Sequence, residues 1–265
     1  MKKLLIVAVI ISFGAVSIYA QGELNEQQKV FFRNERSFSF TISTDGYGFG
    51  YRGAKRLDYL NKRLLEIESG IIKHPKEYRI NNVYAQGGSF VFGKLNLPFY
   101  LRAGLGHQHE LYTKADLGGV AIRYFYSGGP TLAIYKPIYY KVLYPTGFNE
   151  YTIKIEKYNS SIALPQDIYS KASFSKGLDE IKVTPGLYLK GGFNFEYSKQ
   201  DKVIHAIEIG AQISAYIKEI PIMASPDNKA IFFSLFATYR FGMIIDPLNP
   251  DDNSFSNLFR RKSSE

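Results

Sequence analysis

The stretch Ile231-Phe-Phe-Ser-Leu-Phe-Ala-Thr-Tyr-Arg-Phe241 decides the fold. Every odd-numbered residue in it is apolar or aromatic, whereas Ser234, Thr238 and Arg240 stand between them. Successive side chains of a β-strand point to opposite faces, so one face of this strand meets an apolar medium. The other face carries polar and charged groups. A run of about ten such residues has the length of a tilted strand that crosses a bilayer.

The same alternation recurs along the chain. Between Ile207 and Ile217, apolar residues alternate with Glu208, Gly210 and Gln212. Similar segments precede this one, and those at 85–96 and 130–144 have the poorest phase: 37–42, 47–52, 65–71, 85–96, 99–106, 120–126, 130–144 and 185–197. Pro137 predicts a bulge, because proline cannot donate to a strand ladder. The pattern predicts an all-β chain, with about ten strands in a closed antiparallel up-and-down transmembrane β-barrel over residues 35–242. Eight or twelve strands also fit.

A soluble β-sandwich or lipocalin-like barrel is the alternative fold for an alternating sequence. Such a fold turns its apolar residues inward. Here the second face is rich in Gly, Ser and charged residues, which would make a poor dry core. With 21 Tyr and 20 Phe, the chain also has many side chains suited to a membrane–water interface. These features favour the membrane barrel.

The first 20 residues predict export. Lys2 and Lys3 precede an apolar run from Leu4 to Val16, and the segment ends on Ala20. This is the pattern of a secretory signal peptide, and the run is too short for a membrane-spanning helix. We predict cleavage after Ala20, a periplasmic N-terminal segment 21–34 and a periplasmic C-terminal tail 243–265. The absence of cysteine suits a compartment outside the cytoplasm.

The connections between the predicted strands divide into two sets. With both termini periplasmic, the outer connections are 44–46, 73–83, 108–117, 145–181 and 218–228, and the inner ones are 56–61, 96–97, 127–129 and 199–202. All the long loops are therefore expected outside, as in outer-membrane barrels. Loop 145–181 is the longest. Its many apolar residues predict that it folds over the barrel mouth or buries them against something else, with a short helix in 166–180 that begins after Leu164-Pro165.

Several segments carry a family resemblance. Tyr239-Arg240-Phe241 resembles the aromatic-x-aromatic strand end of Gram-negative outer-membrane β-barrel proteins, although Gly242 to Glu265 follow it where a typical barrel stops. Further segments resemble stretches of uncharacterised small barrels of this class: Lys73-His74-Pro75-Lys76-Glu77, Gly93-Lys94-Leu95-Asn96 and Ile122-Arg-Tyr-Phe-Tyr-Ser-Gly-Gly-Pro130. The resemblance implies this fold, an outer-membrane location and recognition of Tyr239 and Phe241 by the barrel-assembly machinery. It implies no activity.

The inward face of the predicted barrel concentrates charge. Alternation places six cations and four carboxylates there: Arg52, Lys94, Arg102, Arg123, Lys190 and Arg240, with Glu66, Glu68, Glu196 and Glu208. A barrel of about this size has room for little besides its own side chains. We therefore expect these groups to pair into a network that largely fills the lumen. A narrow pore lined by cations is the alternative.

Catalytic and metal sites have weak support in the sequence. No Ser lies near a His with an orienting acid, and there is no Gly-x-Ser-x-Gly motif. His107 and His109 share one strand face and are weak metal candidates, because two imidazoles do not complete a site. We expect no enzyme, no metal and no cofactor.

Function is less constrained than fold. A net charge of +9 suits a barrel rim against anionic lipid, and no basic cluster with interleaved aromatic residues indicates nucleic acid. We expect a non-enzymatic accessory or scaffold barrel in an envelope assembly for secretion, surface-protein export or membrane biogenesis. Its expected contacts are outer-membrane lipid, the barrel-assembly machinery, and envelope proteins that bind loop 145–181 or the C-terminal tail. A small passive pore is the alternative.

Overall fold

A computed structural model describes residues 34–81, 88–115, 118–148, 150–159, 162, 164–198 and 202–245. All of these residues belong to one compact unit, Phe32–Glu265. The predicted signal peptide, almost all of segment 21–34 and the tail beyond residue 245 lie outside the described residues. Among the described residues, no helix has the length and apolar character needed to cross a membrane.

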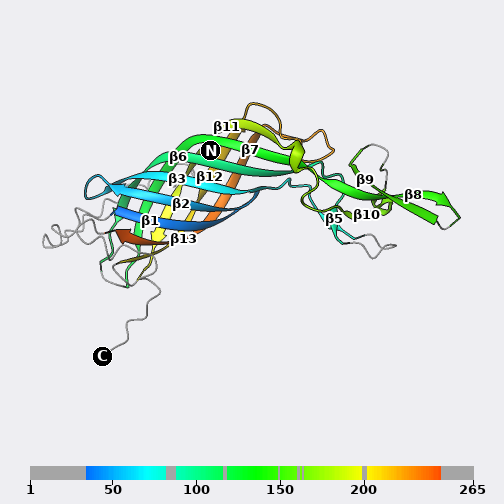
Figure 1. Cartoon of the computed structure of the whole chain (residues 1–265). Coiled ribbons are helices and arrows are strands. Elements are labelled where there is room, and N and C mark those ends of the chain that lie inside the picture. Colours follow the sequence, from blue (N-terminus) through cyan, green and yellow to red (C-terminus); the bar gives the residue numbers. More distant parts are fainter. Residues whose placement is uncertain are drawn as a thin grey trace, which may run out of the picture. The chain divides into compact units, whose positions relative to one another are not determined.

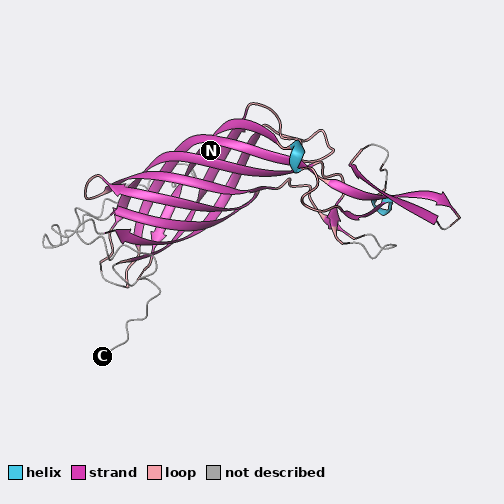
Figure 2. Ribbon diagram, in the orientation of Figure 1, coloured by secondary structure: helices cyan, strands magenta, loops and turns pink. Residues whose placement is uncertain are grey.

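Eight strands form a closed antiparallel barrel (Figures 1 and 2). The sheet order is β1, β13, β12, β11, β7, β6, β3, β2, and β2 pairs with β1 to complete the circle. The strands are β1 (Asn34–Ser43), β2 (Gly46–Arg56), β3 (Asn61–Ile72), β6 (Asn96–Tyr112), β7 (Ala121–Pro137), β11 (Lys182–Glu196), β12 (Val203–Tyr216) and β13 (Ile231–Ile245). Closure leaves no unpaired strand edge in the barrel, which a lipid environment requires.

The strand count is eight, the lower of the alternatives, and not ten. The predicted strand at 85–96 is absent from the described residues. Only β5 (Phe90–Val91) lies there, paired with β4 (Arg79–Ile80). Gly93 has φ +72°, so a turn stands where a strand was expected.

The second difference in the count arises because two predicted barrel strands contribute to a single one. Segment 120–126 and the first part of 130–144 join into β7, which ends at Pro137, and the predicted turn at 127–129 lies in mid-strand. The rest of 130–144 belongs to a separate strand that begins at Tyr139. Gly128 and Gly129 pair with Leu189 and Tyr188 of β11, so neighbouring strands hold this part of the chain extended. A Cβ on Gly129 would lie 2.2 Å from the Ala103 carbonyl oxygen. Glycine is therefore needed for close strand approach and not for a turn.

Two ends of the barrel can be distinguished. The terminal end holds Asn34, Ile245 and the short connections 57–60, 113–120 and 197–202; the loop end holds 44–45, 73–95, 138–181 and 217–230. The predicted outer connection 108–117 is wrong. β6 continues to Tyr112, and the turn after it lies at the terminal end. Every long connection still emerges at one end.

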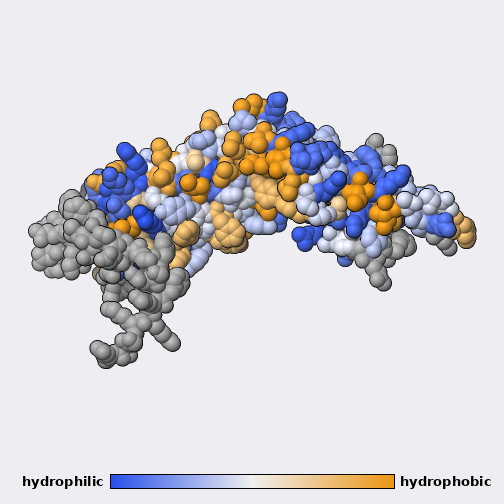
Figure 3. Space-filling model, in the orientation of Figure 1, coloured by the Kyte–Doolittle hydropathy of each residue, from blue (hydrophilic) through white to orange (hydrophobic). Residues whose placement is uncertain are grey.

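The barrel has an apolar outside and a polar inside. Outward residues of β13 such as Phe233 and Leu235 are exposed, whereas Ser234, Thr238 and Arg240 are buried. Figure 3 shows apolar side chains spread over the barrel surface in view. This polarity is the reverse of a soluble barrel, and it is the arrangement that a lipid surround stabilises.

A second, smaller sheet lies outside the barrel, in the loop-end segment 138–181. We call it the outer sheet: β8 (Tyr139–Gly147), β9 (Glu150–Lys157) and β10 (Ile168–Lys171), in the order β10, β8, β9. The predicted short helix over 166–180 is wrong: the segment forms β10 and two 3-10 turns, Pro165–Asp167 and Leu178–Glu180. Pairing of β10 with β8 takes the place of helical hydrogen bonds.

Candidate functional site

The centre of the lumen is built around one carboxylate. Glu208 on β12 is completely buried. Arg52 holds it with Nη1–Oε1 and Nη2–Oε2 distances of 2.5 and 3.2 Å. Arg240 reaches the same two oxygens from Nε and Nη2, at 3.0 and 2.9 Å. Two arginine forks on one carboxylate satisfy both of its oxygens with charge-assisted bonds.

Further carboxylates form ion pairs on either side of Glu208 along the barrel. Glu66 accepts a hydrogen bond from Arg52 Nε at 2.5 Å. Towards the loop end, Lys190 pairs with Glu68. Arg102 there donates to Gln212 at 2.8 Å, and its guanidinium lies over the Tyr100 ring at 4.0 Å. Arg102 of β6 therefore reaches across the lumen to β12 at this level.

A third group of charges lies towards the terminal end. Arg123 pairs with Glu196, and its Nε lies 3.4 Å from Glu110 Oε2. Lys62 pairs with Glu35. The inward faces of the described strands therefore carry seven cations and six carboxylates in ion pairs, namely Arg52, Arg56, Lys62, Arg102, Arg123, Lys190 and Arg240 with Glu35, Glu66, Glu68, Glu110, Glu196 and Glu208.

Nine of the ten residues predicted for the lumen lie in it, and Lys94 does not. Lys94 was assigned to a strand at 85–96, but it lies in the connection between β5 and β6. Its Nζ contacts Glu77 Oε2 at 2.6 Å, and the residue forms an isolated bridge with Met223. Lys94 therefore links the 73–95 connection to the connection between β12 and β13.

The sequence analysis missed Glu35, Lys62 and Glu110 because it predicted three strands that were too short at the terminal end. All three continue the inward phase of their strands: Glu35 precedes Ser37, Lys62 precedes Leu64, and Glu110 follows Gln108. Extending the alternation by two to four residues would have found them. Arg56 of β2 also continues the inward phase and pairs with Glu110, so the paired lumen charges keep an excess of one cation.

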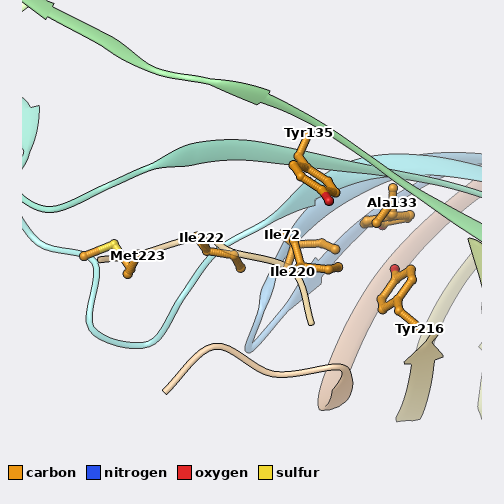
Figure 4. Close-up of a cluster of buried hydrophobic side chains, with 8 residues drawn as sticks. Ile72, Ala133, Tyr135, Tyr216, Ile220, Ile222 and Met223 are labelled. Carbon is orange, nitrogen blue, oxygen red and sulfur yellow. The ribbon is translucent and has the colours of Figure 1, made fainter. Parts of the chain in front are cut away.

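An apolar cluster closes the lumen at the loop end. The connection between β12 and β13 folds so that Ile220 and Ile222 are almost completely buried. They form a cluster with Ile72 of β3, Ala133 and Tyr135 of β7, and Tyr216 of β12 (Figure 4). We call residues 220–223 the cork. It places buried apolar side chains at the mouth beside the charged network.

The cork is held by neighbouring loops. The Ile222 carbonyl accepts a hydrogen bond from Leu95 N at 2.8 Å, and Ala224 N donates to the Gly93 carbonyl at 2.7 Å. The Asn228 side chain accepts from the Ile222 and Met223 amides at 2.9 and 3.1 Å. Buried backbone groups of the cork are thus paired, as a stable closure requires.

None of the four histidines faces the lumen. His107 Nε2 and His109 Nδ1 lie 2.9 and 2.8 Å from the side-chain oxygen of Asn61. Because an amide oxygen only accepts, both nitrogens donate to it and are not available to a metal. Among the described residues, no group of three potential ligands assembles.

An aromatic girdle covers part of the outside of the barrel at the terminal end, on β6, β7, β12 and β13. His107 and His109 lie against Tyr126 and Tyr124, and His205 Nδ1 lies 2.8 Å from the Tyr239 hydroxyl. Tyr239 and Phe241 both face outward on β13. Rings with one apolar and one polar edge are typical of a membrane–water interface. Recognition of Tyr239 and Phe241 by the assembly machinery stays a prediction.

The outer sheet has its own small core. Tyr140, Val142 and Ile168 are buried against Phe90 and Ile162. The Tyr140 hydroxyl lies 2.9 Å from the Val91 carbonyl oxygen and 2.7 Å from that of Lys94. Burial raises the pKa of Tyr140, so the phenol stays a proton donor. Segment 138–181 therefore packs on β4, β5 and the start of β6, and the cork, not this segment, lies at the barrel mouth.

Comparison with known proteins gives structural likeness only. No family model and no curated protein matches the chain. Neisserial surface protein A superposes with a TM-score of 0.36 at 8% identity, covering 81% of this chain and 97% of that one. Ail, the attachment invasion locus protein of Yersinia pestis, gives 0.35 at 7%, with 80% and 95% covered. The N-terminal β-barrel domain of Pseudomonas aeruginosa OprF gives 0.34 at 8%, with 81% and 99% covered.

The closed sheet, the outward apolar belt, the inward charges and the aromatic girdle are features of the chain itself. Together they are incompatible with a water-surrounded barrel. The protein has the fold of an outer-membrane β-barrel.

Proposed function

We propose that this protein is a non-enzymatic, non-conducting barrel of the outer membrane that serves as an accessory or scaffold in an envelope assembly. The observation that carries the proposal is the outer sheet. Its β8–β9 pairing gives one face to the small core and leaves the other face, with Tyr151, Ile153 and Ile155, exposed. Ordered apolar side chains in water favour a contact that covers them.

β9 also offers a free backbone edge. It pairs with β8 on one side, and no described residue pairs with its other side. An extended segment of a partner can add to such an edge, with main-chain hydrogen bonds for affinity and alternate side chains for specificity. The occupant that we propose is therefore an extended strand of an envelope protein, with apolar residues at alternate positions over Ile153 and Ile155.

The passive pore is the second candidate, and the lumen argues against it. Permeation needs a continuous hydrated path, whereas Arg52, Glu66 and Glu208 bond to one another across the lumen and are at most 3% exposed. We expect purified protein to give no stable open steps in planar-bilayer recordings. Regular single-channel steps would favour the pore and contradict the sealed lumen.

The contact surface is tested by placing charge on β9. Ile153→Lys with Ile155→Lys leaves the barrel untouched and adds two ammonium groups to the exposed face. We expect recovery of crosslinked partners from native outer membranes to fall at least tenfold, since losing about 1.4 kcal/mol of contact energy already gives that factor. The measurement is crosslinking followed by purification through the barrel.

Leu164→Lys with Leu178→Lys is the matched control. These residues belong to the same loop-end segment and are about as exposed as the two isoleucines, at 49% and 45% against 48% and 52%. The control should keep the partners. Undiminished recovery with the β9 variant would place the contact elsewhere, and the C-terminal tail would be examined next.

A further inference from the structure

Cations gather on one arc of the barrel's outer surface at the terminal end. Arg36 on β1, Lys55 on β2 and Arg63 on β3 are exposed and follow the outward phase of their strands. Lys55 and Arg63 are directly opposite in the sheet, and Arg36 is opposite Gly53, two residues before Lys55. No described carboxylate lies within ion-pair distance of the three. Among the described residues they form an arc of positive charge without a carboxylate partner.

Among the described barrel strands, the arc has no equivalent around the rest of the terminal end. There the outward residues of β6, β7, β11, β12 and β13 include no lysine or arginine, and they are aromatic, imidazole or aliphatic, such as His107, Tyr124, Phe195, His205 and Phe241. A solvated rim would distribute its cations around the circumference. The concentration on three neighbouring strands therefore points to a ligand.

Gly53 makes a notch within this arc. It lies between Arg36 and Leu65 in the sheet, and a Cβ added to it would meet nothing within 4 Å. The missing side chain lets a ligand approach the backbone between the cations. Directly towards the loop end lie Phe38, Leu65 and Ile67, which are 53%, 54% and 49% exposed and belong to the apolar belt.

We infer that this arc is a binding site for the headgroup of an anionic phospholipid. The phosphate lies in the Gly53 notch among Arg36, Lys55 and Arg63, and the acyl chains lie on Phe38, Leu65 and Ile67. Arginine suits this role because its planar fork matches phosphate oxygens. Continuity with the apolar belt favours a lipid over a soluble phosphate, because only a lipid fills both parts.

The test uses native mass spectrometry of the full chain in detergent with equal amounts of phosphatidylglycerol and phosphatidylcholine. We expect the wild type to retain phosphatidylglycerol preferentially. Each cation near a lipid surface contributes about 1 kcal/mol, or roughly fivefold in affinity. Arg36→Gln, Lys55→Gln and Arg63→Gln together should therefore reduce the preference on the order of 100-fold.

Two further variants separate a built site from general charge. Lys154→Gln, Lys218→Gln and Lys229→Gln remove three exposed cations from the loop-end connections and should leave the preference unchanged. Gly53→Leu keeps every charge and fills the notch, so it should also abolish the preference, and it remains informative if the triple variant fails to fold.

Four results would overturn the inference. They are equal retention of both lipids by the wild type, an unaltered preference in the arc variant, an equal loss in the charge control, and an unaltered preference in Gly53→Leu. Glycerol phosphate is the soluble probe. If it displaces the lipid at equal concentration, the site binds free phosphate and the lipid assignment is wrong.

Discussion

Glu208→Ala is expected to destabilise the barrel by about 3–5 kcal/mol, because it leaves buried arginines without their counter-ion. Arg52 and Arg240 each place two nitrogens on this carboxylate, and Asn194 Nδ2 adds a hydrogen bond at 2.8 Å. Glu66 alone cannot replace it, since it lies 3.7 Å from Arg240. The lost charge therefore affects both arginines together.

The temperature at which the folded form loses its faster gel mobility reports this change. Glu208→Ala should lower that temperature clearly, whereas Glu219→Ala, which removes an exposed carboxylate from the β12–β13 connection, should leave it unaltered. An unaltered temperature in Glu208→Ala would mean that water solvates the arginines. The sealed lumen would then lose its main support, and the passive pore would become the better proposal.

Tyr140→Ala is expected to detach the outer sheet while the barrel persists. Tyr140 is the largest residue in that small core, and it lies within 6.2 Å of the Phe90 ring between centroids. Truncating a buried aromatic side chain costs about 3–5 kcal/mol. A three-stranded sheet with so few buried residues has little stability in reserve.

Limited proteolysis separates the two effects of this substitution. We expect cleavage within 138–181 to become much faster, with the heat-induced change in gel mobility unaltered. Tyr151→Ala is the control, because its ring is exposed on the opposite face of the same sheet. If the barrel also loses its heat resistance, the two cores fold as one unit, and the outer sheet is no separate contact module.

Alternation along the strands made the sequence informative. A bilayer requires apolar side chains on the outer face of each strand, and the narrow lumen accepts polar ones on the inner face. Alternation along the strand therefore suffices to place Glu208 and Arg240 inside and Phe233 outside. The same logic reaches Glu35 and Glu110 once the strands are extended. Fold class, polarity and most of the lumen network are therefore local properties that can be read from the sequence.

Tertiary structure decided the features that the alternation of side chains does not specify. Gly128-Gly129-Pro130 has the local chemistry of a turn, yet pairing with β11 along β7 keeps it extended, and this sets the strand count. Ile220 and Ile222 belong to a connection without periodicity, and only contacts with Ile72, Ala133 and Tyr135 make it a cork. The arc of Arg36, Lys55 and Arg63 is likewise visible only in the sheet, because register brings distant segments together. Sequence thus determined which way each strand faces, whereas non-local packing determined how many strands there are, what closes the mouth and where the outer cations gather.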